Sequence, residues 1–167
     1  MMRKIATAVI FLSLLLGITS CGGANGIGPV LVIEPATSSI AVNETVSVSV
    51  NITDVANLTA IEMHLSFDAN LLEVVEVTNG GFLQPDFVVQ DIYDNAAGTL
   101  DYAIAQMNQP PVSGTGTLIT VVFRAKAPGS SSIRFQGTNA APQGVLLADS
   151  EGKAIEISLV NGDLNIK

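Results

Sequence analysis

The feature that most constrains the fold is a stretch of alternating apolar and polar residues between Leu58 and Val77. Within it every second residue is apolar, as in Ile61, Met63, Leu65 and Phe67. Successive side chains of a β-strand point to opposite faces of the sheet, so this pattern predicts a strand with one buried face. The turn formers at 68–70 end the strand, and a second apolar run follows at 71–77. Two strands joined this closely form a nucleus to which the other strands can add.

The rest of the chain from residue 30 onward reads as short strands separated by turn residues. Further strands are expected at residues 30–34, 45–52, 87–93, 100–106, 117–127, 132–135, 145–147, 154–159 and 163–166. A loop is expected around Pro110, Pro111, Gly114 and Gly116. No stretch after the first 29 residues shows convincing helical periodicity. The sequence therefore predicts an all-β fold, an antiparallel β-sandwich of jelly-roll type with about nine strands.

The first residues resemble an export signal. Residues 1–4 are basic, and the apolar run at 5–18 is shorter than the ~20 residues that a membrane-spanning helix needs. Ile18-Thr19-Ser20-Cys21 then resembles the lipobox of bacterial lipoproteins, where the enzyme cuts before a cysteine that carries lipid. We expect a lipoprotein signal peptide at 1–20, lipidation of Cys21 and a Gly-rich tether at 21–29. The alternative is an ordinary signal peptide with an incidental cysteine.

Charge narrows the range of partners. Arg3 and Lys4 lie in the leader, so its removal leaves five of the seven basic residues against fifteen acidic ones. Phosphate backbones would repel so acidic a domain, and nucleic acid is therefore not an expected partner. Contact with a membrane should come from the lipid anchor alone. The predicted location is that of an exported, membrane-anchored lipoprotein at the cell surface or envelope.

The sequence offers little catalytic chemistry. The one histidine, His64, falls on the outward face of the central strand, where no nucleophile accompanies it, and it is expected to be solvated. Zinc needs several His or Cys ligands at short spacing, and the acidic clusters at 91–95 and 149–151 lack the EF-hand pattern. We expect no enzymatic activity, no metal site and no cofactor.

The order of motifs resembles a cohesin domain, the β-sandwich module with which cellulosome scaffoldins and cell-surface proteins bind dockerins. The likeness runs from about residue 30 to residue 167 and gives the fold more securely than the function. Its most specific part is the aromatic-Asp step at residues 67–68 followed by a Leu-rich strand. The residues that carry it are Phe67-Asp68, Leu71-Leu72-Glu73-Val74-Val75, Gly98-Thr99-Leu100, Pro128-Gly129 and Asn161-Gly162-Asp163-Leu164-Asn165-Ile166.

The resemblance implies a surface for binding a partner. In cohesins the dockerin lies on an outer sheet face that includes the strand before the aromatic-Asp step, where type I members usually place Asn and Asp. The corresponding residues here are Ala60 and Glu62, so Ala60 departs from the type I pattern. The neighbouring strand contributes Ala103, Ala105 and Gln106. Alternation independently points all of these except Gln106 outward, and an ordinary solvated sheet face is the other interpretation.

These observations favour a non-catalytic, surface-anchored module that docks a dockerin-like protein and is linked to polysaccharide binding or degradation. The alternatives are a carbohydrate-binding module and a structural envelope lipoprotein. Sugar-binding platforms present exposed aromatic rings, but the chain has no Trp, and Tyr102 is predicted to point inward. Phe82, Phe87 and Tyr93 are expected to anchor the core or loops.

Overall fold

The computed structural model describes residues 28–167, and this part of the chain folds entirely into strands, turns and loops. The strands are β1 (Val30–Glu34), β2 (Thr37–Ile40), β3 (Thr45–Ser66), β4 (Leu72–Asn79), β5 (Phe87–Asp94), β6 (Thr99–Ala105), β7 (Val112–Ala125), β8 (Gly129–Phe135), β9 (Val145–Asp149), β10 (Ser158–Val160) and β11 (Gly162–Ile166). The predicted all-β sandwich is confirmed. Cys21 and the predicted signal peptide lie outside the described residues.

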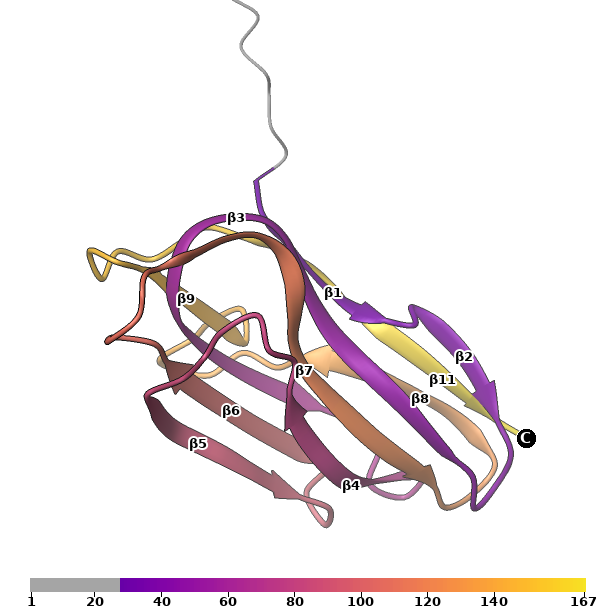
Figure 1. The fold of residues 1–167 in the computed structure, drawn as a ribbon. Helices are drawn as coiled ribbons and strands as arrows, with labels where there is room; N and C mark the ends of the chain where they lie inside the picture. Colours follow the sequence, from indigo (N-terminus) through magenta and orange to yellow (C-terminus); the bar gives the residue numbers. More distant parts are fainter. Residues whose placement is uncertain (1–27) are drawn as a thin grey trace, which may run out of the picture.

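The long strand β3 organises the sandwich because its two halves belong to different sheets (Figure 1). Residues 45–55 pair antiparallel with β1 and β7. Residues 58–66 pair antiparallel with β6 on one side, and with β9 and then β8 on the other. A strand that passes from one sheet to the other in this way forms a corner of the sandwich.

The corner in β3 depends on two residues with positive φ. Asp54 has a φ of 54° and Asn57 a φ of 55°, a left-handed conformation that Asp and Asn tolerate better than other non-glycine residues. The pairing of β3 with β7 shifts register on either side of Val55, as expected for bulges that bend a strand. Where the backbone pairing is interrupted, hydroxyl groups of β7 accept hydrogen bonds from backbone N–H groups of β3; Ser113 Oγ, for example, accepts the Asn57 N–H at 2.9 Å. β3 and β7 therefore curve together around one end of the molecule (Figure 1).

The two sheets differ in their edges. The first sheet runs β4, β7, the first half of β3, β1 and β10. The second sheet runs β5, β6 and the second half of β3, and continues through β8 to β11 and β2. β9 pairs with β3 on the same side as β8. β5 pairs with β6 alone and is therefore a free edge of the second sheet. This placement leaves the outer face of β9, β3, β6 and β5 as one continuous surface.

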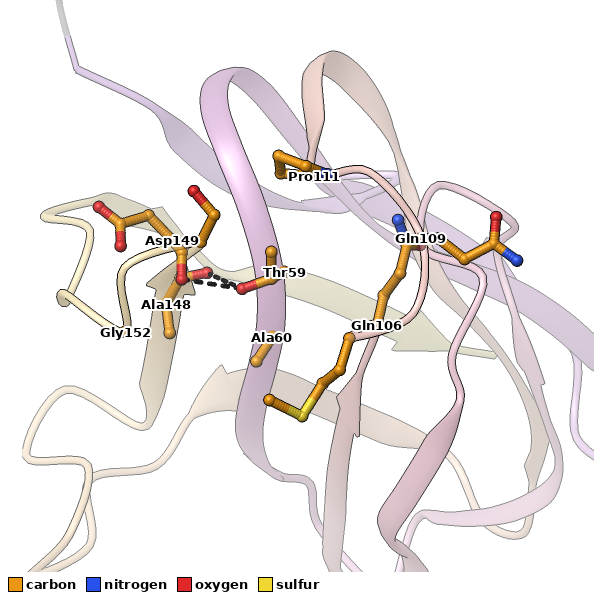
Figure 2. Close-up of a pocket in the computed structure, with 10 residues that line it drawn as sticks. Thr59, Ala60, Gln106, Gln109, Pro111, Ala148, Asp149 and Gly152 are labelled. Carbon is orange, nitrogen blue, oxygen red and sulfur yellow. Dashed lines mark hydrogen bonds between the residues drawn. The ribbon is translucent and has the colours of Figure 1, made fainter.

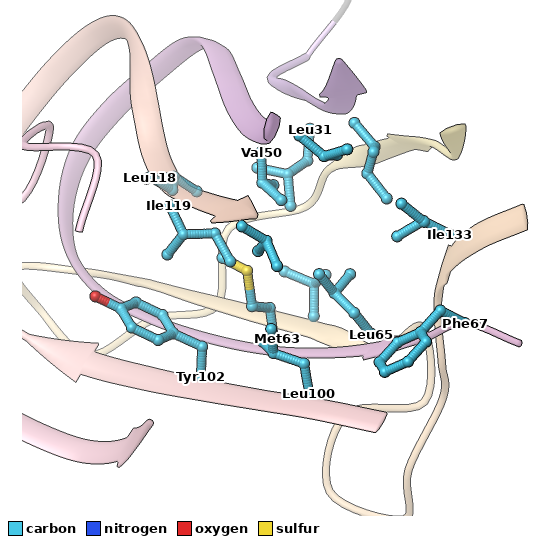
Figure 3. Packing of buried hydrophobic residues seen from close by; sticks show 14 of the residues in the cluster. Leu31, Val50, Met63, Leu65, Phe67, Leu100, Tyr102, Leu118, Ile119 and Ile133 are labelled. Carbon is cyan, nitrogen blue, oxygen red and sulfur yellow. The ribbon is translucent and has the colours of Figure 1, made fainter. Parts of the chain in front are cut away.

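The core lies between the two sheets (Figure 3). Val50 and Ile119 point inward from the first sheet, and Met63 and Leu65 from the second, each at most 2% exposed. Full burial of such a side chain contributes about 1.5–3 kcal/mol. The prediction that Tyr102 points inward is confirmed, since it lies among these residues and its hydroxyl accepts a hydrogen bond at 3.2 Å from the Asn79 amide.

Some elements differ from the prediction. β2 was not predicted, because four residues with two serines carry no clear alternation. The loop expected around Gly114 and Gly116 is wrong, because both residues lie in β7, opposite Val55 and Ile52 of β3. Glycine inside a strand often marks a bulge, and Gly114 has a φ of 112°. The strand expected at 154–159 is reduced to its end, β10.

Candidate functional site

Four of the residues predicted to contact a partner lie together on the outer face of the second sheet. In the antiparallel register of β3 and β6, Ala60 lies opposite Ala105 and Glu62 lies opposite Ala103. Directly opposed residues share a face of the sheet, with their Cβ atoms about 4.5–5.5 Å apart. The result is a patch of small side chains with one carboxylate beside it. Ala103 is largely covered by its neighbours and adds little surface.

The neighbouring strands extend this patch on both sides. β9 places Leu146 opposite Glu62, and β5 places Phe87 opposite Ala105 of β6, which is itself opposite Ala60. A line of small residues crosses the middle three strands at right angles to them. We call it the alanine row, and it consists, from β9 to β6, of Ala148, Ala60 and Ala105.

Large apolar side chains stand exposed around the alanine row. Phe87 on β5 is 54% exposed, and Met107, in the loop after β6, is 73% exposed. Val89 and Ile92 on β5 and Leu146 on β9 are exposed as well. Burial of large apolar side chains is the usual outcome of folding, so a cluster of exposed ones around one sheet face marks a surface that binds something.

Two shallow hollows lie on either side of the line between Ala60 and Ala148, and both residues line both hollows. The larger, about 390 Å³, is bounded by the loops at 106–111 and 149–152 (Figure 2). The smaller, about 160 Å³, is bounded by Glu62, Val89 and Leu146. Thr59 fixes the strand spacing in the larger hollow, because its hydroxyl donates to two carbonyls of β9 at 3.2 and 2.9 Å. The alanine row therefore separates two hollows on the outer face, and we call this part of the face, with both hollows, the trough.

The exposed aromatic residues of β5 correct an expectation. Phe87 and Tyr93 were expected to anchor the core or loops, but both are exposed. Only Phe82 packs against the core, as expected. Phe87 lies opposite Ala105, on the outer face, whereas Tyr93 lies opposite the buried Leu100 and so belongs to the other face of the strand. The sequence at residues 87–93 indicates a strand, but it does not show that this strand is a sheet edge.

Gln106 does not lie on the outward patch with the four residues above. Its side chain is 2% exposed and makes two hydrogen bonds of 2.6 Å. The oxygen accepts the Gln84 N–H, and the amide nitrogen donates to the Pro110 carbonyl. Both partners are backbone groups of loops, so Gln106 holds the rim of the larger hollow in place. Parity along the strand predicts this inward direction, because Gln106 follows the outward Ala105.

A second side chain supports the same rim. Asp86 accepts the backbone N–H groups of Asn108 and Met107 at 2.6 and 2.8 Å. The hydrogen bond from the Asn108 N–H is the main cause that lowers the pKa of this carboxyl below its ordinary value; desolvation opposes it, and the bond from Met107 adds to the lowering. Asp86 therefore stays ionised and keeps the chain turned so that Met107 lies at the edge of the trough.

The sequence predicts a solvated histidine at position 64, and this prediction is wrong. The His64 side chain is 12% exposed and lies between two carboxylates on the outer face. Nε2 is 2.8 Å from Glu62 Oε1, and Nδ1 is 2.6 Å from Asp101 Oδ1. Partial burial alone would lower the pKa of His64, but the hydrogen bonds to Asp101 and Glu62 outweigh it, so the pKa lies above the ordinary 6.5. Asp101 sits opposite His64 in the β3–β6 register, a neighbour that only the sheet pairing reveals.

The outer face of the first sheet has a different character. Its residues on β3 and β7 are small and hydroxyl-rich or amide-bearing, and several bond one another, such as Thr117 to Asn51 at 2.7 Å. An ion pair of 2.9 Å joins Arg124 and Glu73 at its edge. The polar outward residues include Ser47, Ser49, Asn51, Thr53, Thr117 and Thr120, and Val122 lies opposite Ser47 on the same face. The two faces of the sandwich are therefore unequal: most of the large exposed apolar side chains belong to the second sheet and its loops, and only Val75 on β4 and Val160 on β10 among them belong to the first.

Within residues 28–167, no three His, Cys, Asp or Glu side chains are arranged to hold a metal ion. The same part of the chain has no helix that could cross a membrane. The predicted lipidation site, Cys21, lies outside it.

Comparison with known proteins agrees with this architecture. The model of the cohesin domain family matches residues 30–163. Cellulose-binding protein A of Clostridium cellulovorans is 30% identical over 137 residues, a match that covers 78% of this chain and 7% of that protein. This chain therefore corresponds to a small part of that relative.

Solved structures show the same fold. A non-cellulosomal cohesin from Archaeoglobus fulgidus has a TM-score of 0.66 and 23% identity, covering 84% of this chain and 91% of its own. The cohesin in a type I cohesin–dockerin complex from Clostridium thermocellum has a TM-score of 0.70 and 15% identity, covering 84% and 99%. A type II cohesin domain from Acetivibrio cellulolyticus has a TM-score of 0.70 and 23% identity, covering 83% and 95%. On the family match, this chain belongs to the cohesin domain family.

Proposed function

We propose that this protein is a docking module that binds a dockerin-like protein through the outer face of β9, β3, β6 and β5. Cohesin domains are non-catalytic modules that bind dockerins. The single observation that carries the proposal is the trough, in which the alanine row lies between two hollows and exposed apolar side chains surround it.

The dimensions of the trough suit a helix of the partner. Neighbouring strands lie about 4.8 Å apart, so the trough spans about 14 Å from β9 to β5. At 1.5 Å per residue, this length takes about nine residues of an α-helix. Alanine side chains let a helix approach the sheet closely, while the two hollows can each receive an apolar side chain. We infer that the partner presents an amphipathic helix with apolar anchors.

The charges on this face favour a basic partner group. Glu62 and Asp101 both present carboxylates beside the trough, with side chains 30% and 38% exposed. The chain as a whole carries a formal net charge of −8. Complementary charge increases association rates and fixes the register of an interface. A Lys or Arg of the partner helix beside Glu62 would meet this condition.

The test is binding to a panel of purified dockerin modules in calcium-containing buffer, measured by isothermal titration calorimetry. Glu62→Arg should weaken binding tenfold or more, about 1.4 kcal/mol, because it reverses a charge facing the partner. Ser47→Arg is the matched control, since Ser47 is exposed on β3 but belongs to the face of the first sheet. Circular dichroism checks that both variants fold. Equal affinity of Glu62→Arg and Ser47→Arg would remove Glu62 from the docking surface.

We also propose that the module is exported and held at the membrane by lipid on Cys21. The support is the lipobox-like sequence at 18–21 and the similarity to a cellulose-binding protein. In a bacterial host, the wild-type protein should partition with membranes, and Cys21→Ser should move it to the soluble fraction. Wild-type protein that stays soluble would contradict the anchor. A link to polysaccharide binding or degradation is part of the same proposal, and its support is the similarity to a cellulose-binding protein.

A further inference from the structure

His64 bridges two carboxylates on the proposed docking surface. It contacts Glu62 from its own strand and Asp101 from β6, at 2.8 and 2.6 Å, with most of its ring covered. Glu62 is also the carboxylate that borders the smaller hollow of the trough. A bond to His64 therefore holds in place the charged group that we assign to the partner contact.

The number of protons on the imidazole decides how many carboxylates it can hold. A protonated imidazole has two N–H donors and satisfies both carboxylates, whereas a neutral one has a single donor and one lone pair. After loss of the proton, one carboxylate faces a lone pair and is free to accept a hydrogen bond from elsewhere. The charge of the three groups changes from −1 to −2, and the proton passes to the solvent.

We propose that His64 is a positioning residue that couples docking to proton release: a basic side chain of the partner takes over Glu62 as His64 loses its proton. This inference rests on the proposed docking function and specifies its partner and its regulation. Affinity for a dockerin with a basic contact residue should then rise with pH. The hydrogen bonds to Asp101 and Glu62 hold the pKa of His64 above its ordinary 6.5, so the change in affinity is expected above pH 6.5.

The other charged groups near His64 make no hydrogen bond to its imidazole ring. On β5, Asp94 lies opposite Thr99 and is occupied by the N–H groups of residues 96 and 97, while Asp91 lies opposite the inward Tyr102. On β8, Arg134 lies opposite Ser66 and donates to Ser132. The segment at 136–144, which bonds the backbone of His64, contains no titratable side chain. Two carboxylates are thus the groups bonded to the ring.

The test measures binding of a dockerin module, selected from the panel above for affinity to the wild type, between pH 6 and pH 8.5. Titrations in two buffers with different ionisation enthalpies give the number of protons released. Affinity should rise with pH by at most about tenfold per pH unit, the limit for one proton, with net proton release on binding. His64→Gln keeps a polar side chain that does not titrate. Any change of affinity with pH that remains in this variant comes from other groups, including those of the dockerin, and is subtracted from the wild-type profile. The variant should lose the rise that is specific to the wild type.

If His64→Gln folds poorly, a second variant can still test the coupling. Asp101→Asn removes one charge that holds the proton, so the rise in affinity should shift to lower pH. Binding that is independent of pH, or the same pH profile in His64→Gln as in wild type, would overturn the coupling and leave the docking function intact. Failure of every dockerin to bind wild-type protein at any pH would instead overturn the docking function, and the coupling with it.

Discussion

Replacing Gln106 by Leu should destabilise the domain although the residue touches no partner. The substitution keeps most of the side-chain volume but removes two hydrogen bonds of 2.6 Å to the Gln84 N–H and the Pro110 carbonyl. Each neutral hydrogen bond contributes about 1 kcal/mol net, so the free energy of unfolding should fall by about 2 kcal/mol. For a domain of this size, that loss corresponds to a decrease in Tm of about 4–8 °C.

Urea unfolding followed by circular dichroism measures this loss. Gln109→Leu is the matched control, because Gln109 lies in the same loop with its side chain exposed. The control should stay within about 0.5 kcal/mol of wild type. Dockerin affinity should fall less in Gln106→Leu than in Glu62→Arg, because Gln106 acts only through the rim of the trough. If Gln106→Leu is as stable as Gln109→Leu, the buried amide does not hold the two loops, and our account of Gln106 is wrong.

Three further changes test other parts of the fold. The pKa of His64 lies above 6.5 in the folded protein, so its stabilising effect is complete below pH 6.5 and is lost as pH rises through the folded pKa; urea unfolding across this range should show the loss in wild type and not in His64→Gln. Gly98→Ala should cost more than about 2 kcal/mol in thermal unfolding, because Gly98 has a φ of 73° and a Cβ there would overlap the Phe67 carbonyl oxygen; stability close to wild type would contradict this. Asn95→Ala should cost about 2 kcal/mol in urea unfolding, because its amide bonds both the N–H and the carbonyl of Val74 at 2.7 and 2.9 Å, and Asn95→Asp should recover only the first of these bonds.

The sequence predicts most strands because alternation reports directly on burial. It predicts the outward direction of Ala60, Glu62 and Ala105 for the same reason, since parity within a strand is a local property. Register between strands is not local, and so the pairing of His64 with Asp101 and the burial of the histidine between two carboxylates could not be predicted.

The remaining differences have a related origin. Asp54 and Asn57 are turn formers, so the sequence suggests a break where β3 in fact bends and continues. That continuity depends on hydroxyl groups of β7, which are more than fifty residues away along the chain. Likewise, the exposure of Phe87 follows from the position of β5 at a free sheet edge, which only the strand order reveals.

The continuity of β3 has a mechanical consequence. Its second half forms the centre of the proposed docking surface, and its first half pairs over five residues with β1, the first strand of the described domain. Tension applied by a docked partner would therefore pass along one unbroken backbone and into β1, the strand that follows the predicted tether. The two loaded strands meet at the same end of this ladder, because Val30 of β1 lies opposite Thr53 of β3. The force would therefore open its hydrogen bonds one after another, and the packed interior between the layers would carry little of the load.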